Sequence, residues 1–254
     1  MKSIEFIGPS SIGKSTFLQA FSEHAGHSPK WVTHAAVLEQ LRPRPLGITG
    51  RMLRKIRGAG HYPAESRKIN LFELYNDDIA PLTELFISSL AAGDSDAWQK
   101  VQLSNYYFNS IIKRALRIHH EYHCPKLVLF DEGIFQVGRI TSYDPETTSR
   151  DTLTRSEILP SAIVHFDLPD DAYRARIEQR FRENGVRKFH RTGKSVTPDM
   201  LDEYMAFYKS MGFRKVDICH ELDIPVLQLE ANPTTDNLKR LEDFMDSVHR
   251  DHFA

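Results

Sequence analysis

MKSIEFIGPSSIGKSTFLQAF, residues 1 to 21, is the most informative segment of this chain. It opens with a short apolar run from Ile4 to Ile7 and ends with the helix-like residues 15–21. Between them, Gly8 to Ser15 match in full the pattern Gly, four residues, Gly-Lys-Ser/Thr. Glycines let the backbone fold around a phosphate chain, and the N-terminus of the next helix attracts the anion. The segment therefore predicts a strand, a phosphate-binding loop and a helix.

The polar residues of this loop each have an expected role. Lys14 is expected to reach the β- and γ-phosphates of a bound nucleotide, and Ser15 to supply a hydroxyl ligand to Mg²⁺. Thr16 would support the turn. The residues predicted to bind the nucleotide here are Gly8, Ser10, Ser11, Ile12, Gly13, Lys14, Ser15 and Thr16. The alternative interpretation is a glycine-rich turn with a solvated lysine.

The rest of the chain alternates between two kinds of segment. Short apolar runs, most of them interpreted as strands buried on both faces, occupy residues 4–7, 31–37, 126–130, 162–168 and 225–231. Segments with helical periodicity occupy residues 70–92, 101–123, 169–185, 197–222 and 234–250. This alternation predicts an α/β fold with a parallel sheet, whose ligands bind at the carboxyl ends of the strands. Because no repeat or linker is visible, residues 1–254 are interpreted as a single domain.

Two acidic residues follow the third apolar run directly, in the sequence KLVLFDEG. Asp131 is the better candidate for holding Mg²⁺, directly or through water. Glu132 could take a proton from an acceptor hydroxyl, orient a hydrolytic water or bind the substrate. The alternative is that one of the two only caps the following helix.

Residues 174–195 are rich in arginine and lysine, and we interpret them as a lid that closes over the nucleotide. Phosphoryl transfer needs cations where charge builds up, and Arg176, Arg180 and Arg187 are the candidates. Arg176 and Arg180 are four residues apart and share a helical face. The alternative is a solvated charged helix with Glu178 and Glu183 as partners.

The overall composition argues against several partner classes. The 254-residue chain has a formal net charge of -1 and a pI near 6.9, so neither nucleic acid nor a membrane surface is an expected partner. Its two cysteines match no metal or redox spacing. No apolar stretch is long enough to cross a bilayer, and the N-terminus does not resemble a secretion signal. We therefore expect a cytoplasmic protein.

Together these motifs resemble the P-loop kinases of the nucleoside and nucleotide monophosphate kinase type, most nearly the thymidylate-kinase-like group. The match involves Asp131, DLPDDAYRARIEQR at 167–180 and DIPVLQLEANPTTDNL at 223–238, and covers roughly half the chain. The resemblance implies a P-loop NTPase fold with a five-stranded parallel sheet flanked by helices, and MgATP as donor. It also implies that Arg176 and Arg180 lie near the nucleotide or the transferred phosphate. The ANPT loop, with Asn232 and Pro233, would lie beside the adenine.

The phosphate loop is also similar to that of guanylate kinases, but other features differ from both families. Thymidylate kinases usually have an arginine after the strand-end aspartate, where this chain has Glu132. A carboxylate at this position suits a neutral hydroxyl acceptor, because it can accept the hydroxyl proton.

In this fold the acceptor binds to the segment between the second and third strands, here a helical insertion at residues 38–125. Its first part has an excess of positive charge, contributed by Arg42, Arg44, Arg51, Arg54, Lys55, Arg57, Arg67 and Lys68. This excess indicates an anionic acceptor, an anionic partner surface or merely a solvated loop. Further on, Gln102, Asn105, Tyr106, Tyr107 and Asn109 could hold a ring or a sugar, or belong to the core. His34 and the histidines at 119, 120 and 123 complete no recognised metal-ligand spacing.

We therefore expect an ATP-dependent small-molecule kinase that transfers the γ-phosphoryl group to a nucleoside, nucleotide, sugar or similar metabolite. The first alternative is an NTPase, in which Asp131 and Glu132 activate water and hydrolysis drives a partner. The second is a regulatory module that binds a nucleotide without useful catalysis.

Overall fold

In the computed structural model, the described residues form one sheet of five parallel strands. These residues are 1–26, 28–41, 79–92, 96–137, 140–185 and 195–253. The strands are β1 (Ser3–Ile7), β2 (Trp31–Thr33), β3 (Leu127–Phe130), β4 (Ala162–Asp167) and β5 (Val226–Glu230). Their order across the sheet is β2-β3-β1-β4-β5, with β1 in the centre. The α/β class with a five-stranded parallel sheet is confirmed.

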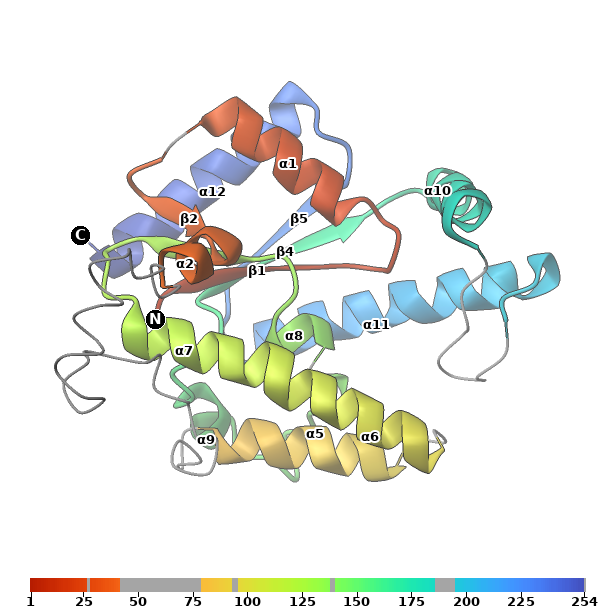
Figure 1. Cartoon of the computed structure of the whole chain (residues 1–254), viewed down its shortest axis with the longest axis horizontal. Coiled ribbons are helices and arrows are strands. Elements are labelled where there is room, and N and C mark those ends of the chain that lie inside the picture. The colour runs from red at the N-terminus through yellow and green to blue at the C-terminus, as the bar shows by residue number, and fades with distance from the viewer. Residues whose placement is uncertain (27, 42–78, 93–95, 138–139, 186–194, 254) are drawn as a thin grey trace, which may run out of the picture.

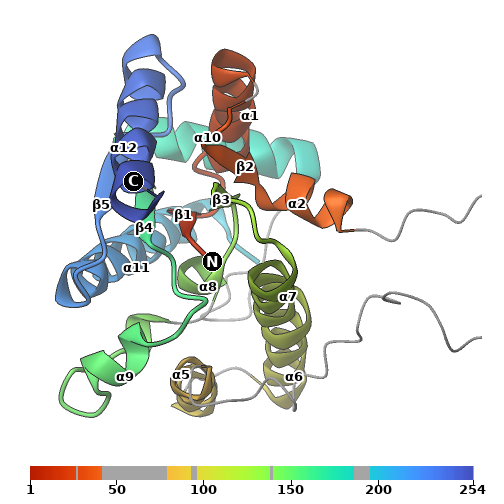
Figure 2. The same cartoon turned by 90° about the vertical axis from the view of Figure 1, so that its left-hand side faces the viewer.

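Helices cover both faces of this sheet (Figures 1 and 2). On one face lie α1 (Lys14–Ala25) and α12 (Thr235–Phe253), and on the other lie α7 (Lys113–Glu121), α8 (Ile134–Val137) and α11 (Leu201–Glu221). The other α-helices of the described residues are α2 (His34–Gln40), α5 (Ala80–Ala92), α6 (Ala97–Tyr106), α9 (Arg150–Thr154) and α10 (Asp170–Asn184), and two short 3-10 helices span Ile140–Ser142 and Pro198–Met200. A π-helical segment, Tyr107–Ile112, joins α6 to α7. The described part of the chain contains no helix of the length and apolarity that a bilayer crossing requires.

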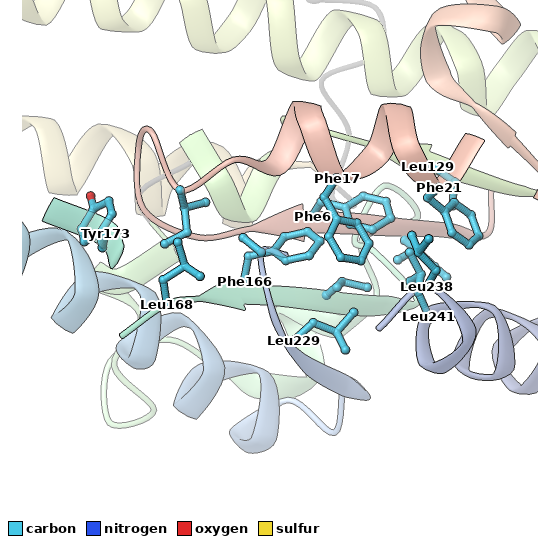
Figure 3. Packing of buried hydrophobic residues seen from close by; sticks show 14 of the residues in the cluster. Phe6, Phe17, Phe21, Leu129, Phe166, Leu168, Tyr173, Leu229, Leu238 and Leu241 are labelled. Carbon is cyan, nitrogen blue, oxygen red and sulfur yellow. The ribbon is translucent and has the colours of Figure 1, made fainter. Parts of the chain in front are cut away.

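Successive side chains of the central strands β1 and β4 point to opposite faces of the sheet and pack under the helices on each face. Phe6 of β1 and Phe166 of β4 point toward α1, where Phe17 packs on them (Figure 3). The Phe17 and Phe166 ring centroids are 4.8 Å apart. The intervening residues of the same strands, including Glu5 and His165, therefore face α11 on the other side.

The two edge strands differ from the sequence-based expectation. Residues 31–37 were expected to form a buried strand, but β2 ends at Thr33 and only half-buried residues form it. The Thr33 hydroxyl accepts a hydrogen bond from the Ala36 N–H (3.3 Å) and caps α2, which ends the strand. The other edge strand, β5, is also partly exposed. Burial on both faces therefore holds for β1, β3 and β4 only.

The predicted helices agree better with the structure. Residues 101–123 are helical almost throughout, and α10 and α11 fall within their predicted ranges. A hydroxyl caps the last helix, since Thr234 Oγ1 accepts from the Asn237 N–H (3.2 Å). In the predicted helix 70–92, α5 begins at Ala80, and residues 70–78 lie outside the described residues. Both cysteines are free thiols.

Gly212 of α11 lies directly over the imidazole of His165 in β4. A Cβ atom at position 212 would lie 2.8 Å from His165 Nε2. His165 is only 1% exposed, so its ring has little space into which it can move. The close packing of α11 on the sheet thus depends on the absence of a side chain at this position.

We expect Gly212→Ala to lower the free energy of unfolding by about 1–3 kcal/mol, because it overpacks a rigid contact. This loss should outweigh the gain of about 1 kcal/mol in helix propensity. Urea denaturation measures it. In a His165→Ala background, where the space is free, the same glycine change should cost much less. An equal cost in both backgrounds would show that this contact is not the cause.

Candidate functional site

The glycine-rich loop, residues 8–13, connects β1 to α1 at the carboxyl end of the sheet. Gly8 has φ 146°, and a Cβ there would lie 2.6 Å from the Phe166 carbonyl oxygen. Gly13, at the start of α1, has φ 104°. Ser11 also has a positive φ, 69°. Larger side chains at the two glycines would be strained, so this loop path depends on them.

Lys14 folds back over this loop. Its Nζ donates hydrogen bonds to the carbonyl oxygens of Gly8 (2.9 Å) and Pro9 (3.3 Å). Burial, with a smaller contribution from the positive charge of Lys215, lowers the pKa of Lys14 to about 8. The Ser11 hydroxyl is buried and has no hydrogen-bond partner among the described residues. An ammonium group and an unsatisfied hydroxyl therefore lie together at the loop.

A cleft of about 570 Å³ opens beside the loop, and we call it the main cleft. Of the residues predicted for the site, it is lined by residues 10–16, Glu132, Arg176, Arg180 and Pro233. The structure thus brings together four segments that are far apart in the sequence. Gly8 instead lines an adjoining cavity of about 140 Å³, which shares Gln136 with the main cleft.

Arg176 of α10 joins the glycine-rich loop to the loop that follows β5. Its guanidinium donates to the carbonyl oxygens of Ile12 and Ala231 (3.1 Å for the latter) and to Asn232 Oδ1 (2.6 Å). Burial lowers the pKa of this guanidinium. Arg180, one turn later, also lines the main cleft, and no hydrogen bond or ion pair connects it to another described residue. Arg180 is thus the more available of the two cations.

The strand-end turn, residues 131–133, carries the two predicted acids. The Asp131 side chain is 45% exposed, does not line the main cleft, and lies 3.5 Å from His34 Nδ1. Glu132 lines the cleft, and its carboxylate accepts a hydrogen bond from the Tyr106 hydroxyl (2.6 Å). Burial and this hydrogen bond raise the pKa of Tyr106 to about 12. Helix α6 therefore reaches the cleft through Tyr106.

His34 and Arg114 form a hydrogen-bonded pair behind this turn, and sequence reasoning missed Arg114. His34 Nδ1 is 3.3 Å from the Leu129 carbonyl oxygen, so Nδ1 carries the proton, and Nε2 accepts from Arg114 (3.3 Å). Burial, together with the charge of Arg114, lowers the pKa of His34. Arg114 also donates to the Glu132 carbonyl oxygen. The pair thus supports the strand-end turn through the Glu132 carbonyl oxygen.

Ser15 and Asp131 offer hydroxyl and carboxylate oxygens, the ligand types that Mg²⁺ prefers. Ser15 is exposed at the first turn of α1. Within the described residues there is no group of three or more histidine, cysteine or acidic side chains that could hold a metal alone. These donor types fit an ion that takes most of its ligands from a nucleotide and water, to which Ser15 would contribute from the main cleft and Asp131, which does not line it, through water.

Other predicted residues have mixed outcomes. Tyr107 belongs to the core and stacks on Phe86 (centroids 3.8 Å apart), and Asn105 bonds to Asn109 instead of facing the cleft. Arg174 of α10 pairs with Asp202 of α11, whereas the alternative of a solvated charged helix named Glu178 and Glu183 as partners. The predicted lid residue Arg187, the neighbouring basic residues up to Lys194 and the basic residues between 42 and 68 lie outside the described residues.

We compared the chain with protein-family models and with curated proteins, and neither comparison gave a match.

Proposed function

We propose that this protein is a cytoplasmic, ATP-dependent small-molecule kinase with a P-loop fold, most similar to the thymidylate-kinase-like group. One observation carries the proposal. The glycine-rich loop, Lys14, Arg180 and Glu132 meet in one cleft at the carboxyl end of a parallel sheet. Such a cleft provides amides and cations for phosphates next to a carboxylate for an acceptor.

The residues of the cleft have separate roles in phosphoryl transfer. The amides of the glycine-rich loop and Lys14 bind the phosphates, and Ser15 and Asp131 provide ligands for Mg²⁺. When bound, MgATP supplies the γ-phosphoryl group. Arg180 neutralises charge that builds up on this group, and Arg176 holds the loop in position through its carbonyl contacts. In this proposal Asn232 and Pro233 lie beside the base, and Arg187 adds charge from the lid.

Glu132 is the residue that orients the acceptor. One of its oxygens accepts from Tyr106, so the carboxylate has a fixed direction and can accept a second hydrogen bond from an acceptor hydroxyl. The support from α6 links the acceptor to the helical insertion, as the resemblance implies. A hydroxyl compound is therefore the favoured acceptor class.

The same carboxylate could orient a water molecule, so ATP hydrolysis is the second candidate function. Glu132 lies in the main cleft with the loop and Lys14, as a water-orienting residue must. The two functions differ in their need for an acceptor.

ADP release from MgATP by the purified protein distinguishes them. We expect slow release with the protein alone and faster release with one pool among nucleosides, nucleotides, sugars and other hydroxylated metabolites. Fast release without any pool would instead establish hydrolysis. Tight MgATP binding without release under any condition would indicate a regulatory module and contradict both proposals.

A further inference from the structure

Glu5 is a fully enclosed acid in the middle of the central strand. Its Oε2 accepts a hydrogen bond from the Phe135 N–H (3.0 Å) and its Oε1 from the Gln136 N–H (2.5 Å). A Cβ at Gly133 would lie 2.5 Å from Glu5 Oε2, so the absence of a side chain there lets the turn approach the carboxylate. Glu5 thus binds the backbone that follows the strand-end turn.

Gln136 connects this carboxylate to two other elements. Its carbonyl oxygen accepts from Lys215 Nζ of α11 (3.0 Å). Its side-chain Oε1 accepts from the Gly8 N–H of the glycine-rich loop (3.3 Å). Since its own N–H donates to Glu5, this one residue contacts β1, α11 and the loop. It also lines the main cleft.

Burial of these charged groups carries a large desolvation cost. Glu5 is 2% exposed and Lys215 is 9% exposed. Burial raises the pKa of Glu5 to about 7 and lowers that of Lys215 to about 8, while each charge partly stabilises the other. The cost of removing two charges from water can exceed their mutual attraction, and apolar residues of similar volume are often as stabilising or more so. Stability alone therefore gives little reason for an acid and a lysine beneath the cleft.

We propose that Glu5, Gln136 and Lys215 form a positioning unit that fixes the strand-end turn relative to the glycine-rich loop. The unit contacts the backbone on the carboxyl side of Glu132, at Phe135 and Gln136, and the backbone of the glycine-rich loop at Gly8. It thereby sets the separation between the groups that bind the phosphates and the carboxylate that orients the acceptor. The inference rests on the proposed function, because it assigns this separation a catalytic purpose.

Gln136→Met is the most specific test of the positioning unit, because it changes only the contact with the glycine-rich loop. Methionine keeps the length of the side chain and the backbone bonds to Glu5 and Lys215, and removes only the acceptor for the Gly8 N–H. We expect faster amide hydrogen exchange, by at least about tenfold, in peptides that cover residues 6–13. We also expect kcat for ADP release to fall about 10- to 100-fold, since small displacements of reacting groups have effects of this size.

Val248→Ala is the matched control, because it removes buried methyl groups from α12 in the core under α1. It should lower stability without changing kcat or the exchange of residues 6–13. Glu5→Gln keeps the shape of the side chain but removes its charge and one of the two oxygens that accept from the Phe135 and Gln136 N–H groups. It should reduce kcat while the KM for MgATP stays within about threefold.

Two results would overturn the inference. One is wild-type exchange of residues 6–13 in the Gln136→Met variant, and the other is an equal fall of kcat in the Val248→Ala control. If the wild-type protein shows no ATP turnover, the proposed function fails. The exchange measurement still decides in that case whether Gln136 positions the loop.

Discussion

Replacing Lys14 by alanine is expected to reduce ADP release from MgATP by about 100- to 1000-fold. Lys14 donates to two carbonyl oxygens of the loop, and burial makes its interaction with phosphate stronger than it would be in water. Removal of one such stabilising group typically costs this much in rate. The fold should survive, because the change removes two hydrogen bonds but also a costly buried charge, so the net change in stability is about 1 kcal/mol or less.

Steady-state ADP release with the stimulating acceptor pool measures this effect. Lys239→Ala is the control, since Lys239 is exposed on α12 and does not line the main cleft. It should leave turnover unchanged. Circular dichroism of both variants shows whether they are folded. If folded Lys14→Ala protein turns over at the wild-type rate, the glycine-rich loop has no part in the reaction.

The sequence predicted most of the fold because local patterns dominate there. The apolar runs and the glycine-lysine pattern were sufficient to place β1, its loop and α1. The exception is the mostly apolar run WVTHAAV at residues 31–37, in which the Thr33 hydroxyl caps α2 and ends β2. A capping bond of this kind competes with strand formation, and an apolar pattern contains no information about it.

The site was predicted only in part because its supporting contacts join residues distant in the chain. Residues 10–16, Glu132, Arg176 and Arg180 line one cleft. Gln136 and Arg114 were missed, since neither belongs to a recognised motif. Gln136 reaches a loop 128 residues away, and Arg114 reaches His34 80 residues away. Such pairings follow from the sheet order, which one sequence does not reveal.

The second large effect is a loss of stability in mild acid, which we expect His165 to cause. Both ring nitrogens are buried without a hydrogen-bond partner among the described residues. Burial lowers the pKa of His165 to about 4; the charges of Lys215, Lys14 and Lys209 act in the same direction, and Asp167 opposes them. In the unfolded chain the ordinary value of 6.5 is restored. The unfolded state therefore binds more protons between pH 6.5 and 4, and stability falls as the pH falls through this window.

The expected contribution is about 3 kcal/mol over the whole window, of which about 2 kcal/mol is lost by pH 5. Glu5 acts in the opposite direction. Its pKa in the folded protein is raised to about 7, so the folded state binds more protons below that pH and gains stability as the pH falls toward 4.5. The pH dependence of the wild-type protein combines both effects, and only a difference between variants isolates His165.

His165→Leu supplies this difference, because leucine has a similar volume and cannot be protonated. Between pH 7.5 and pH 5, the free energy of unfolding measured by urea denaturation should change more favourably in this variant than in the wild type, by about 2 kcal/mol. His220→Leu is the control on the same helix as Gly212, and its exposed ring should leave the wild-type pH dependence unchanged. An identical pH dependence in His165→Leu and wild type would mean that His165 is protonated equally easily in both states. In that case the His165 ring does not lower the free energy of unfolding in acid. It then affects stability only through its packing against Gly212.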